Sequence, residues 1–412
     1  MKKSAWFKTT LAVAIATVSS HSLANGLTIN EQSASSMGTG FAGRSSSAID
    51  ASTVFGNPAG MSKLDRAEVS GGFAVIDAST DISGGDNGRG TNDGDMVPLA
   101  AIPFGYYVRP LNEKMHFGLG MYAPFGVISD YEDGFAARNH GLYSKVQVVT
   151  LQPTLSYQIT DRVSVGFGPT INKIDGKLTS NPLTPVGELE VNIKGDDVGY
   201  GFNAGVLVDV TDKLAWGLTY HSKVDYELEG RTRITGAPAP VGINGSYDAK
   251  LDFTSPESVD TSVTYQLDDQ WTLHAGTTWT RWSQLQEIVV DNRGVTGPFA
   301  GAFTSIDEQL TWNDTWSFAF GAAYQLNPQW VLRTGFALDE SPTTDADRTV
   351  RIPVGDRKIL SLGAGWNATD DLTVDFAYAY LREDKSEVNY DDYSAEFRNT
   401  AHGLSTQVTY RF

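Results

Sequence analysis

The feature that most constrains the fold is an alternation of bulky apolar with small or polar residues, which recurs over most of the chain. In the clearest run, Trp316, Phe318 and Phe320 are separated by Ser317 and Ala319. A period of two is that of a β-strand, whose successive side chains point to opposite faces. A soluble sandwich would also alternate, but it does not need strands this long and this numerous. In a membrane barrel, the bulky face meets lipid and the small face lines the lumen.

Short polar turns recur between these segments and alternate with longer stretches rich in Gly, Asp and Pro. The turns are Asn112-Glu113-Lys114, Thr160-Asp161-Arg162, Thr211-Asp212-Lys213, Asp268-Asp269, Asn327-Pro328 and Thr369-Asp370-Asp371. Outer-membrane barrels have short periplasmic turns and long outer loops. Six short turns between seven long loops predict an all-β, 14-stranded antiparallel transmembrane β-barrel over residues 66–412, with both termini in the periplasm.

The first 24 residues have the three parts of a secretory signal peptide. Basic Lys2, Lys3 and Lys8 precede an apolar stretch, and small residues lead to an expected cleavage after Ala24. The alternative is a membrane anchor, but about 20 consecutive apolar residues are needed to cross a bilayer as a helix. The apolar stretch, residues 11–18, is far shorter. The sequence therefore predicts export, and an outer-membrane location follows from the barrel.

Composition argues against several other classes of protein. The chain has 31 Lys and Arg against 49 Asp and Glu, and its net charge of −18 disfavours nucleic-acid binding. It has no cysteine, which excludes disulfides and thiolate chemistry. The histidines are scattered without metal-ligand spacing, and no nucleophile motif accompanies them. We therefore expect no enzyme activity, no cofactor and no metal site.

Residues 25–65 do not alternate and are rich in Gly, Ser and Ala. A barrel of about fourteen strands has a lumen too wide for its own side chains to fill, so a segment of this size can plug it. The alternative is a disordered periplasmic tail. At the other end the chain stops on Phe412, and an aromatic end residue on an amphipathic strand resembles the signal read by the barrel assembly machinery.

Immediately before the first expected strand, Asn57-Pro58-Ala59 resembles the NPA signature in the hatch of the long-chain fatty acid outer-membrane transporter family, the FadL/TodX type. A downstream block is similar in order and spacing to the family's eleventh and twelfth strands: Arg333-Thr334-Gly335, Asp339, Ser341-Pro342, Arg348, Ile352-Pro353, Asp356-Arg357 and Ser361. The resemblance extends over the whole mature chain.

The resemblance implies a monomer in contact with outer-membrane lipid and lipopolysaccharide, which moves hydrophobic compounds by passive diffusion. Long-chain fatty acids are the first expectation and monoaromatic hydrocarbons the alternative within transport. The rival from another class is a general diffusion porin. In the family, the hatch gates the lumen and a bend in the third strand opens the wall sideways, which places the gate at Asn57, Pro58 and Ala59.

The matching stretch of the third strand contains Ala123, Pro124, Phe125 and Gly126. Proline cannot donate a hydrogen bond to the β-ladder, so Pro124 leaves neighbouring backbone unpaired. These residues are therefore the expected lateral opening. The alternative is that Pro124 only ends the strand as it enters the outer loop.

Capture of an apolar ligand requires apolar surface on outer loops that are usually hydrophilic. Three loops supply it with residues that include Leu183, Val186, Val241, Phe299 and Phe303. The alternative is that these loops pack on one another as a lid.

A buried fatty acid carboxylate also needs a basic partner. Lys173 is one candidate, since the family places a basic residue on this strand, but it points inward only if Gly168-Pro169 forms a bulge. Arg333 is the other candidate, because it shares parity with the small residues of its strand.

Overall fold

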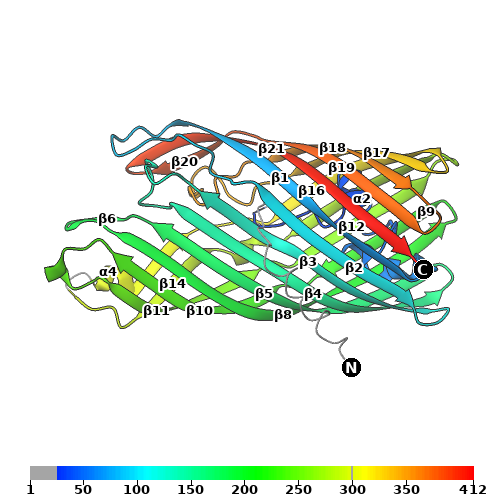
Figure 1. Cartoon of the computed structure of the whole chain (residues 1–412), viewed down its shortest axis with the longest axis horizontal. Coiled ribbons are helices and arrows are strands. Elements are labelled where there is room, and N and C mark those ends of the chain that lie inside the picture. The colour runs from blue at the N-terminus through cyan, green and yellow to red at the C-terminus, as the bar shows by residue number, and fades with distance from the viewer. Residues whose placement is uncertain (1–25, 298–299) are drawn as a thin grey trace, which may run out of the picture.

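The computed structural model describes residues 26–297 and 300–412, so the expected signal peptide, residues 1–24, lies outside the described residues. Nineteen strand segments form one antiparallel sheet (Figure 1). They are β1 (Glu68–Gly84), β2 (Ala100–Pro110), β3 (Met115–Asp130), β4 (Tyr143–Thr160), β5 (Val163–Ser180), β8 (Glu190–Thr211), β9 (Leu214–His221), β10 (Val224–Thr235), β11 (Gly245–Ser255), β12 (Ser258–Gln266), β13 (Trp271–Thr280), β14 (Glu287–Arg293), β15 (Ser305–Gln309), β16 (Thr315–Asn327), β17 (Trp330–Asp339), β18 (Arg357–Asn367), β19 (Leu372–Glu383), β20 (Ser386–Tyr390) and β21 (Tyr393–Arg411).

Five wall strands are interrupted and appear as the pairs β9 and β10, β11 and β12, β13 and β14, β15 and β16, and β19 and β20, so the nineteen segments build fourteen wall strands. The sheet closes on itself because β1 pairs with β21 from Glu68↔Arg411 to Gly84↔Ala395. The predicted 14-stranded barrel is therefore confirmed. Closure leaves no edge strand along this seam, so the backbone groups there need no water.

All six predicted short turns connect consecutive wall strands. The loops at the opposite end carry a small hairpin, β6 (Leu183–Thr184) and β7 (Gly187–Glu188), and the short helices η2 (Ala239–Val241) and α4 (Gly301–Thr304). In Figure 1, β6 and α4 lie at one end of the barrel and the C-terminus lies toward the other. We call the end with the long loops the outer end.

The wall has the two faces that the alternation predicts. Trp316, Phe318 and Phe320 of β16 are exposed on the outside, whereas Ser317 and Ala319 between them are only partly exposed. A transmembrane strand needs only about 9–11 residues to cross the apolar core. Because β8 has 22 residues, the outer parts of the strands project well beyond a membrane.

The N-terminal segment, residues 26–65, is mostly buried and contacts the inner face of the wall. It contains α2 (Ala34–Met37), α3 (Thr53–Gly56) and η1 (Pro58–Lys63). Helix α2 packs on β18, β19 and β21, whereas η1 packs on β3, β4, β5 and β8. Glycines allow the close approach: a Cβ on Gly335 would overlap with the backbone of Thr39.

Candidate functional site

The wall is incomplete between β2 and β3. Their ladder runs from Pro110↔His116 to Gly105↔Met121 and stops there. Above it, residues 100–104 of β2 remain paired with β1, and β3 continues along β4 to Asp130 after a register shift between Tyr122 and Phe125. Pro124 lies within this shift and not at the strand end, so the alternative that it merely terminates the strand is wrong.

The open edge of β3 is occupied by the start of the described chain. Residues 27–29, the N-terminal tip, run antiparallel to it: Ile29 N donates to Pro124 O at 2.9 Å, and Gly126 N donates to Leu27 O at 2.8 Å. The Gln32 side chain adds a hydrogen bond from Nε2 to Ala123 O at 2.5 Å. The tip therefore satisfies backbone groups that β2 leaves unpaired.

A lower cavity, whose empty volume together with adjoining open solvent is about 1020 Å³, lies beside this edge. Its lining includes Tyr122, Pro124 and Phe125 from β3 together with Phe41 and Phe55 from the N-terminal segment, and it also contains many hydroxyl and amide side chains from the wall. The predicted lateral residues Pro124 and Phe125 thus line an internal space.

One ion pair joins the N-terminal segment to the opposite wall of the lower cavity. Arg44 Nη2 lies 3.1 Å from Asp260 Oδ2 on β12, and the two side chains are 13% and 6% exposed. The same guanidinium donates to Thr278 Oγ1 at 3.1 Å and to Asn30 Oδ1 at 3.0 Å. Breaking a buried pair by removing one partner leaves an uncompensated charge. Arg44 therefore holds this side of the segment, a role that the sequence pattern did not reveal.

Asn57-Pro58-Ala59, which we call the NPA turn, is fixed to the wall. Asn57 Nδ2 donates to Ser45 O at 2.6 Å and to Val206 O at 2.9 Å, while Asn57 Oδ1 accepts from Ala59 N at 3.0 Å and so caps η1. The turn rests on Gly166 and Gly205, which face each other on β5 and β8. Any Cβ at these two positions would overlap with the turn.

An upper cavity, whose empty volume together with adjoining open solvent is about 850 Å³, lies on the outer side of the N-terminal tip. It is lined mainly by aliphatic residues: Leu27, Val127, Val146, Ile174, Leu228, Leu251, Leu285, Ile288, Val290, Leu310 and Ile352. Leu27 lines the upper cavity and Thr28 the lower one, so the tip separates the two spaces. The aliphatic lining suits a hydrocarbon chain.

An outer groove, whose empty volume is about 1690 Å³, opens among the loops. Leu183 and Phe303, two of the expected capture residues, line it, and Leu183 is 61% exposed. Val186 and Val241 are not among its lining residues, and Phe299 lies outside the described residues.

The loops around the outer groove also pack on one another. Leu189, Ile243 and Phe303 come from three different loops and share one buried cluster, on which Val241 packs. The loops therefore form a packed cover, and part of their apolar surface borders an open groove.

Two outer loops are clasped beside the groove. The guanidinium of Arg138 donates to both carboxylate oxygens of Glu188, at 2.7 Å and 2.9 Å. This hydrogen bonding holds the pKa of Glu188 below its usual range and outweighs the opposing effect of partial burial.

The two predicted basic partners lie elsewhere. The registers of β5 with β4 and with β8 continue unshifted past Gly168-Pro169, so the required bulge is absent. Lys173 therefore points outward and pairs with Asp196, and this prediction is wrong. Arg333 does point inward, but it forms a buried pair with Asp375 at 2.6 Å and lines neither the upper cavity nor the outer groove.

The sequence reasoning missed Arg351, which lines both the outer groove and the upper cavity. It lies in the long β17–β18 loop, where no periodicity predicts the direction of a side chain. Within residues 26–297 and 300–412, no three His, Asp or Glu side chains are grouped as a metal site would require. The same part of the chain contains no helix long and apolar enough to cross a membrane.

A model of the family described as outer membrane protein transport protein (OMPP1/FadL/TodX) matches residues 15–412. The long-chain fatty acid transport protein of Escherichia coli O6:H1 is 27% identical over the whole of both chains. Outer membrane protein P1 of Haemophilus influenzae is 30% identical over 86% of this chain and 85% of its own.

Two solved structures share the fold. A FadL homologue of Pseudomonas aeruginosa superposes with a TM-score of 0.83 at 24% identity and covers 94% of this chain and 100% of its own. The toluene transporter TbuX of Ralstonia pickettii superposes with a TM-score of 0.68 at 19% identity and covers 92% of this chain and 97% of its own.

Proposed function

Because the chain belongs to the OMPP1/FadL/TodX family of outer-membrane transport proteins, we propose that it carries long-chain fatty acids across the outer membrane by passive diffusion. Transport of hydrophobic compounds follows from the family, whereas the fatty acid is our proposal. Full-length relatives named long-chain fatty acid transport proteins support this choice. The observation that carries it is the series of spaces from an outer groove through an aliphatic cavity to an interrupted wall.

The proposed route has three stages. A fatty acid first lies along Leu183 and Phe303 in the outer groove, then enters the upper cavity with its hydrocarbon chain among aliphatic side chains. From there it passes the N-terminal tip, residues 27–29, and leaves sideways between β2 and β3 near Pro124. Apolar surface accompanies the hydrocarbon chain of the ligand through the first two stages, which keeps it out of lumen water there.

We place the lateral opening at residues 123–126, next to the part of β2 that pairs only with β1 within the described chain. Phe73 of β1 points outward at this level and is 48% exposed, as expected for a lipid-facing side chain. The gap therefore lies level with apolar outer surface, which favours release into the membrane over release into the lumen.

The NPA turn is the proposed gate of the N-terminal segment, residues 25–65, which acts as the hatch. In the closed arrangement Asn57 holds the turn against β8 with its hydrogen bond to Val206 O and ties it to Ser45 O of the same segment. Movement of the hatch requires these bonds and the Arg44–Asp260 pair to break or rearrange. We propose that ligand in the lower cavity competes for this space.

The orientation follows the same proposal. The C-terminus faces the periplasm, the long loops face outward toward lipopolysaccharide, and the protein acts as a monomer. The expected N-terminus, Asn25, lies outside the described residues, and Gly26 lies inside the barrel against Trp282. Phe412 is exposed and stacks on Tyr107 and Tyr410, and its N–H donates to Ala67 O at 2.9 Å. This exposed terminal aromatic supports recognition of the last strand by the barrel assembly machinery.

Uptake by cells that lack their own transporter tests the proposal. With this chain supplied, we expect growth on oleate and no gain in toluene uptake; the opposite result would favour monoaromatic hydrocarbons. Deletion of residues 57–59, or a regular strand built at residues 123–126, should each reduce oleate uptake. Unchanged uptake in both variants would exclude the gate and the lateral exit. Large, steady ion conductance in planar bilayers would instead indicate a diffusion porin.

A further inference from the structure

The β17–β18 loop, residues 340–356, crosses the mouth of the barrel. It starts and ends on β17 and β18, yet Arg351 reaches the opposite wall, where Nη1 donates to Ser144 Oγ at 3.0 Å on β4 and to Thr179 O at 3.2 Å on β5. Between these walls, Tyr131 Oη donates to Val350 O at 2.7 Å. Residues 349–352, which we call the bridge segment, therefore span the lumen at its outer end.

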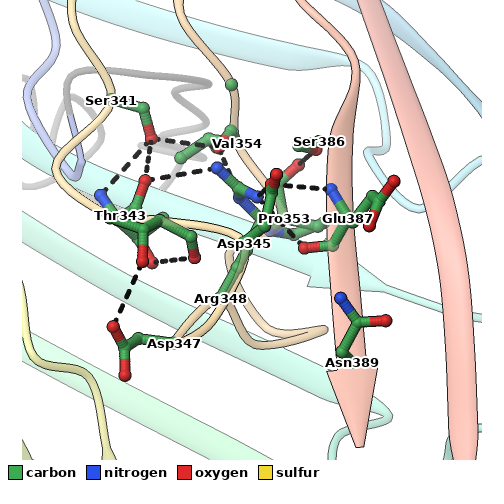
Figure 2. A network of polar contacts seen from close by, with 12 residues as sticks. Ser341, Thr343, Asp345, Asp347, Arg348, Pro353, Val354, Ser386, Glu387 and Asn389 are labelled. Carbon is green, nitrogen blue, oxygen red and sulfur yellow. Dashed lines mark hydrogen bonds and ion pairs between the residues drawn. The ribbon is translucent and has the colours of Figure 1, made fainter.

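The two ends of this loop are held firmly near their own wall. Arg348 donates from Nε to Val354 O at 2.9 Å, from Nη2 to Thr343 O at 3.2 Å and from Nη1 to Glu387 O at 3.0 Å, and it also pairs with Asp345 (Figure 2). These bonds close residues 343–354 into a compact turn. A displacement of the bridge segment therefore does not require the roots of the loop to unfold.

The bridge segment separates the two apolar spaces described above. Thr349 and Arg351 line both the outer groove and the upper cavity, and Ile352 lines the upper cavity. Wall residues of β5, β8 and β14 also continue from one space into the other: Leu178, Ile193, Ile288 and Val290. The aliphatic wall is thus continuous, and the bridge segment lies across the path along it.

The charge at this crossing is concentrated in one ion pair. Arg351 Nε donates to Glu308 Oε2 at 2.8 Å, and the two side chains are 10% and 22% exposed. Both residues line both spaces. Within the described part of the chain, Nη2 of Arg351 makes no hydrogen bond. A guanidinium so little exposed needs a carboxylate partner, and because its N–H donors point in several directions it can donate to a second carboxylate.

We propose that the bridge segment is an outer gate and that Arg351 is its ligand receptor, an inference that rests on the proposed function. A long-chain monocarboxylate in the outer groove binds Arg351 in exchange for Glu308. Loss of the Glu308 contact leaves the bridge segment held by the bonds of Arg351 to β4 and β5 and by the Tyr131 bond, and their rearrangement lets the hydrocarbon chain follow the aliphatic wall into the upper cavity. The gate therefore selects anionic amphipaths over neutral hydrocarbons of the same length.

Equilibrium binding of labelled oleate and oleyl alcohol to the purified full chain in nanodiscs tests this exchange. The two probes share a chain and differ in the carboxylate. Arg351→Met should weaken oleate binding at least tenfold, the order expected for a lost charge-assisted hydrogen bond, and should change oleyl alcohol binding less than twofold. Glu308→Gln should strengthen oleate binding severalfold, because it removes the competing carboxylate.

Arg231→Met is the matched control, since Arg231 lies on the outer face with 67% of its side chain exposed. If Arg351→Met folds poorly, Arg351→Lys is used as a second variant. It keeps the charge and should retain most of the oleate affinity. The proposed exchange of carboxylates would be overturned if Arg351→Met bound both probes equally more weakly, or if Glu308→Gln bound oleate more weakly than the parent chain does. If the parent chain itself binds no oleate, the proposed function fails first; if it binds oleate and Arg351→Met is silent, only the outer gate fails.

Discussion

Asn57→Ala is expected to loosen the hatch without unfolding the barrel. The substitution removes two hydrogen bonds from the buried Nδ2 and the cap that Oδ1 provides for Ala59 N. With about 1 kcal/mol net for each bond, the segment loses about 3 kcal/mol relative to a state in which residues 45–64 are both undocked and locally unfolded; one of the three bonds, to Val206 O, joins it to the wall, and the other two lie within it. This corresponds to roughly a hundredfold increase in the population of its open state. The wall is unaffected because β5 and β8 keep their ladder with each other.

Hydrogen exchange of backbone amides in residues 45–64, measured by mass spectrometry in nanodiscs, reports this population. We expect about hundredfold faster exchange there and unchanged exchange in β5 and β8. Asn112→Ala is the matched control, since Asn112 Oδ1 accepts two backbone hydrogen bonds in an exposed turn remote from the hatch. Exchange in residues 45–64 that stays within about threefold of the parent, with the wall intact, would refute the reasoning about Asn57.

Three further outcomes are expected. Gly205→Ala should displace the NPA turn at a cost of about 1–3 kcal/mol, seen as faster exchange in residues 57–63. Lys173→Ala should change stability by less than about 1 kcal/mol in urea titrations and leave oleate binding unaltered, because its ion pair is exposed. Because Arg138 lowers the pKa of Glu188 in the folded protein, the clasp is present above the ordinary pKa of glutamate and is lost as pH falls through the lowered value. A spin label at Leu183→Cys should gain mobility over that range, and Glu188→Gln should abolish the pH dependence.

The wall could be predicted from sequence because lipid fixes every second residue of a transmembrane strand. On β16, the alternation of Phe318 and Phe320 with Ala319 allows only one inward face, so strand, register and exposure follow together. The interruption near Pro124 was also predictable, since a proline inside such a strand removes a backbone N–H donor whichever segment lies beside it. Its consequence for β2 was not, because the alternation in β2 continues through the residues that do not pair with β3.

The interior could not be predicted in the same way. Lys173 and Arg351 are both basic residues near apolar sequence, yet one pairs with Asp196 outside and the other crosses the lumen. Because no bulge shifts the register of β5, the alternation of that strand decides that Lys173 points outward. A loop has no such alternation, so the direction of Arg351 cannot be predicted in this way. The position of residues 340–356 depends on the carbonyl groups that Arg348 and Arg351 find, and these belong to distant strands. Long-range polar contacts of this kind leave no local pattern in the chain.

The N-terminal tip allows the lateral exit to be tested separately from the outer gate. Its two bonds to β3 are made by backbone atoms, and unpaired backbone groups facing an apolar phase cost several kcal/mol. A chain in which the expected signal peptide, residues 1–24, is followed directly by Glu31 should therefore lose closure of β3 and, with Leu27 and Thr28 gone, the partition between the two cavities.

We expect this truncated chain to conduct small ions in planar bilayers well above the parent. Leu27→Ala should conduct as little as the parent, because it keeps the backbone bonds and loses only a side chain. A truncated chain that stays closed would mean that β2 and β3 can seal the wall by themselves. The gap would then result from the tip that occupies it and would not be a property of the wall, and an exit at residues 123–126 would have to open against a complete sheet.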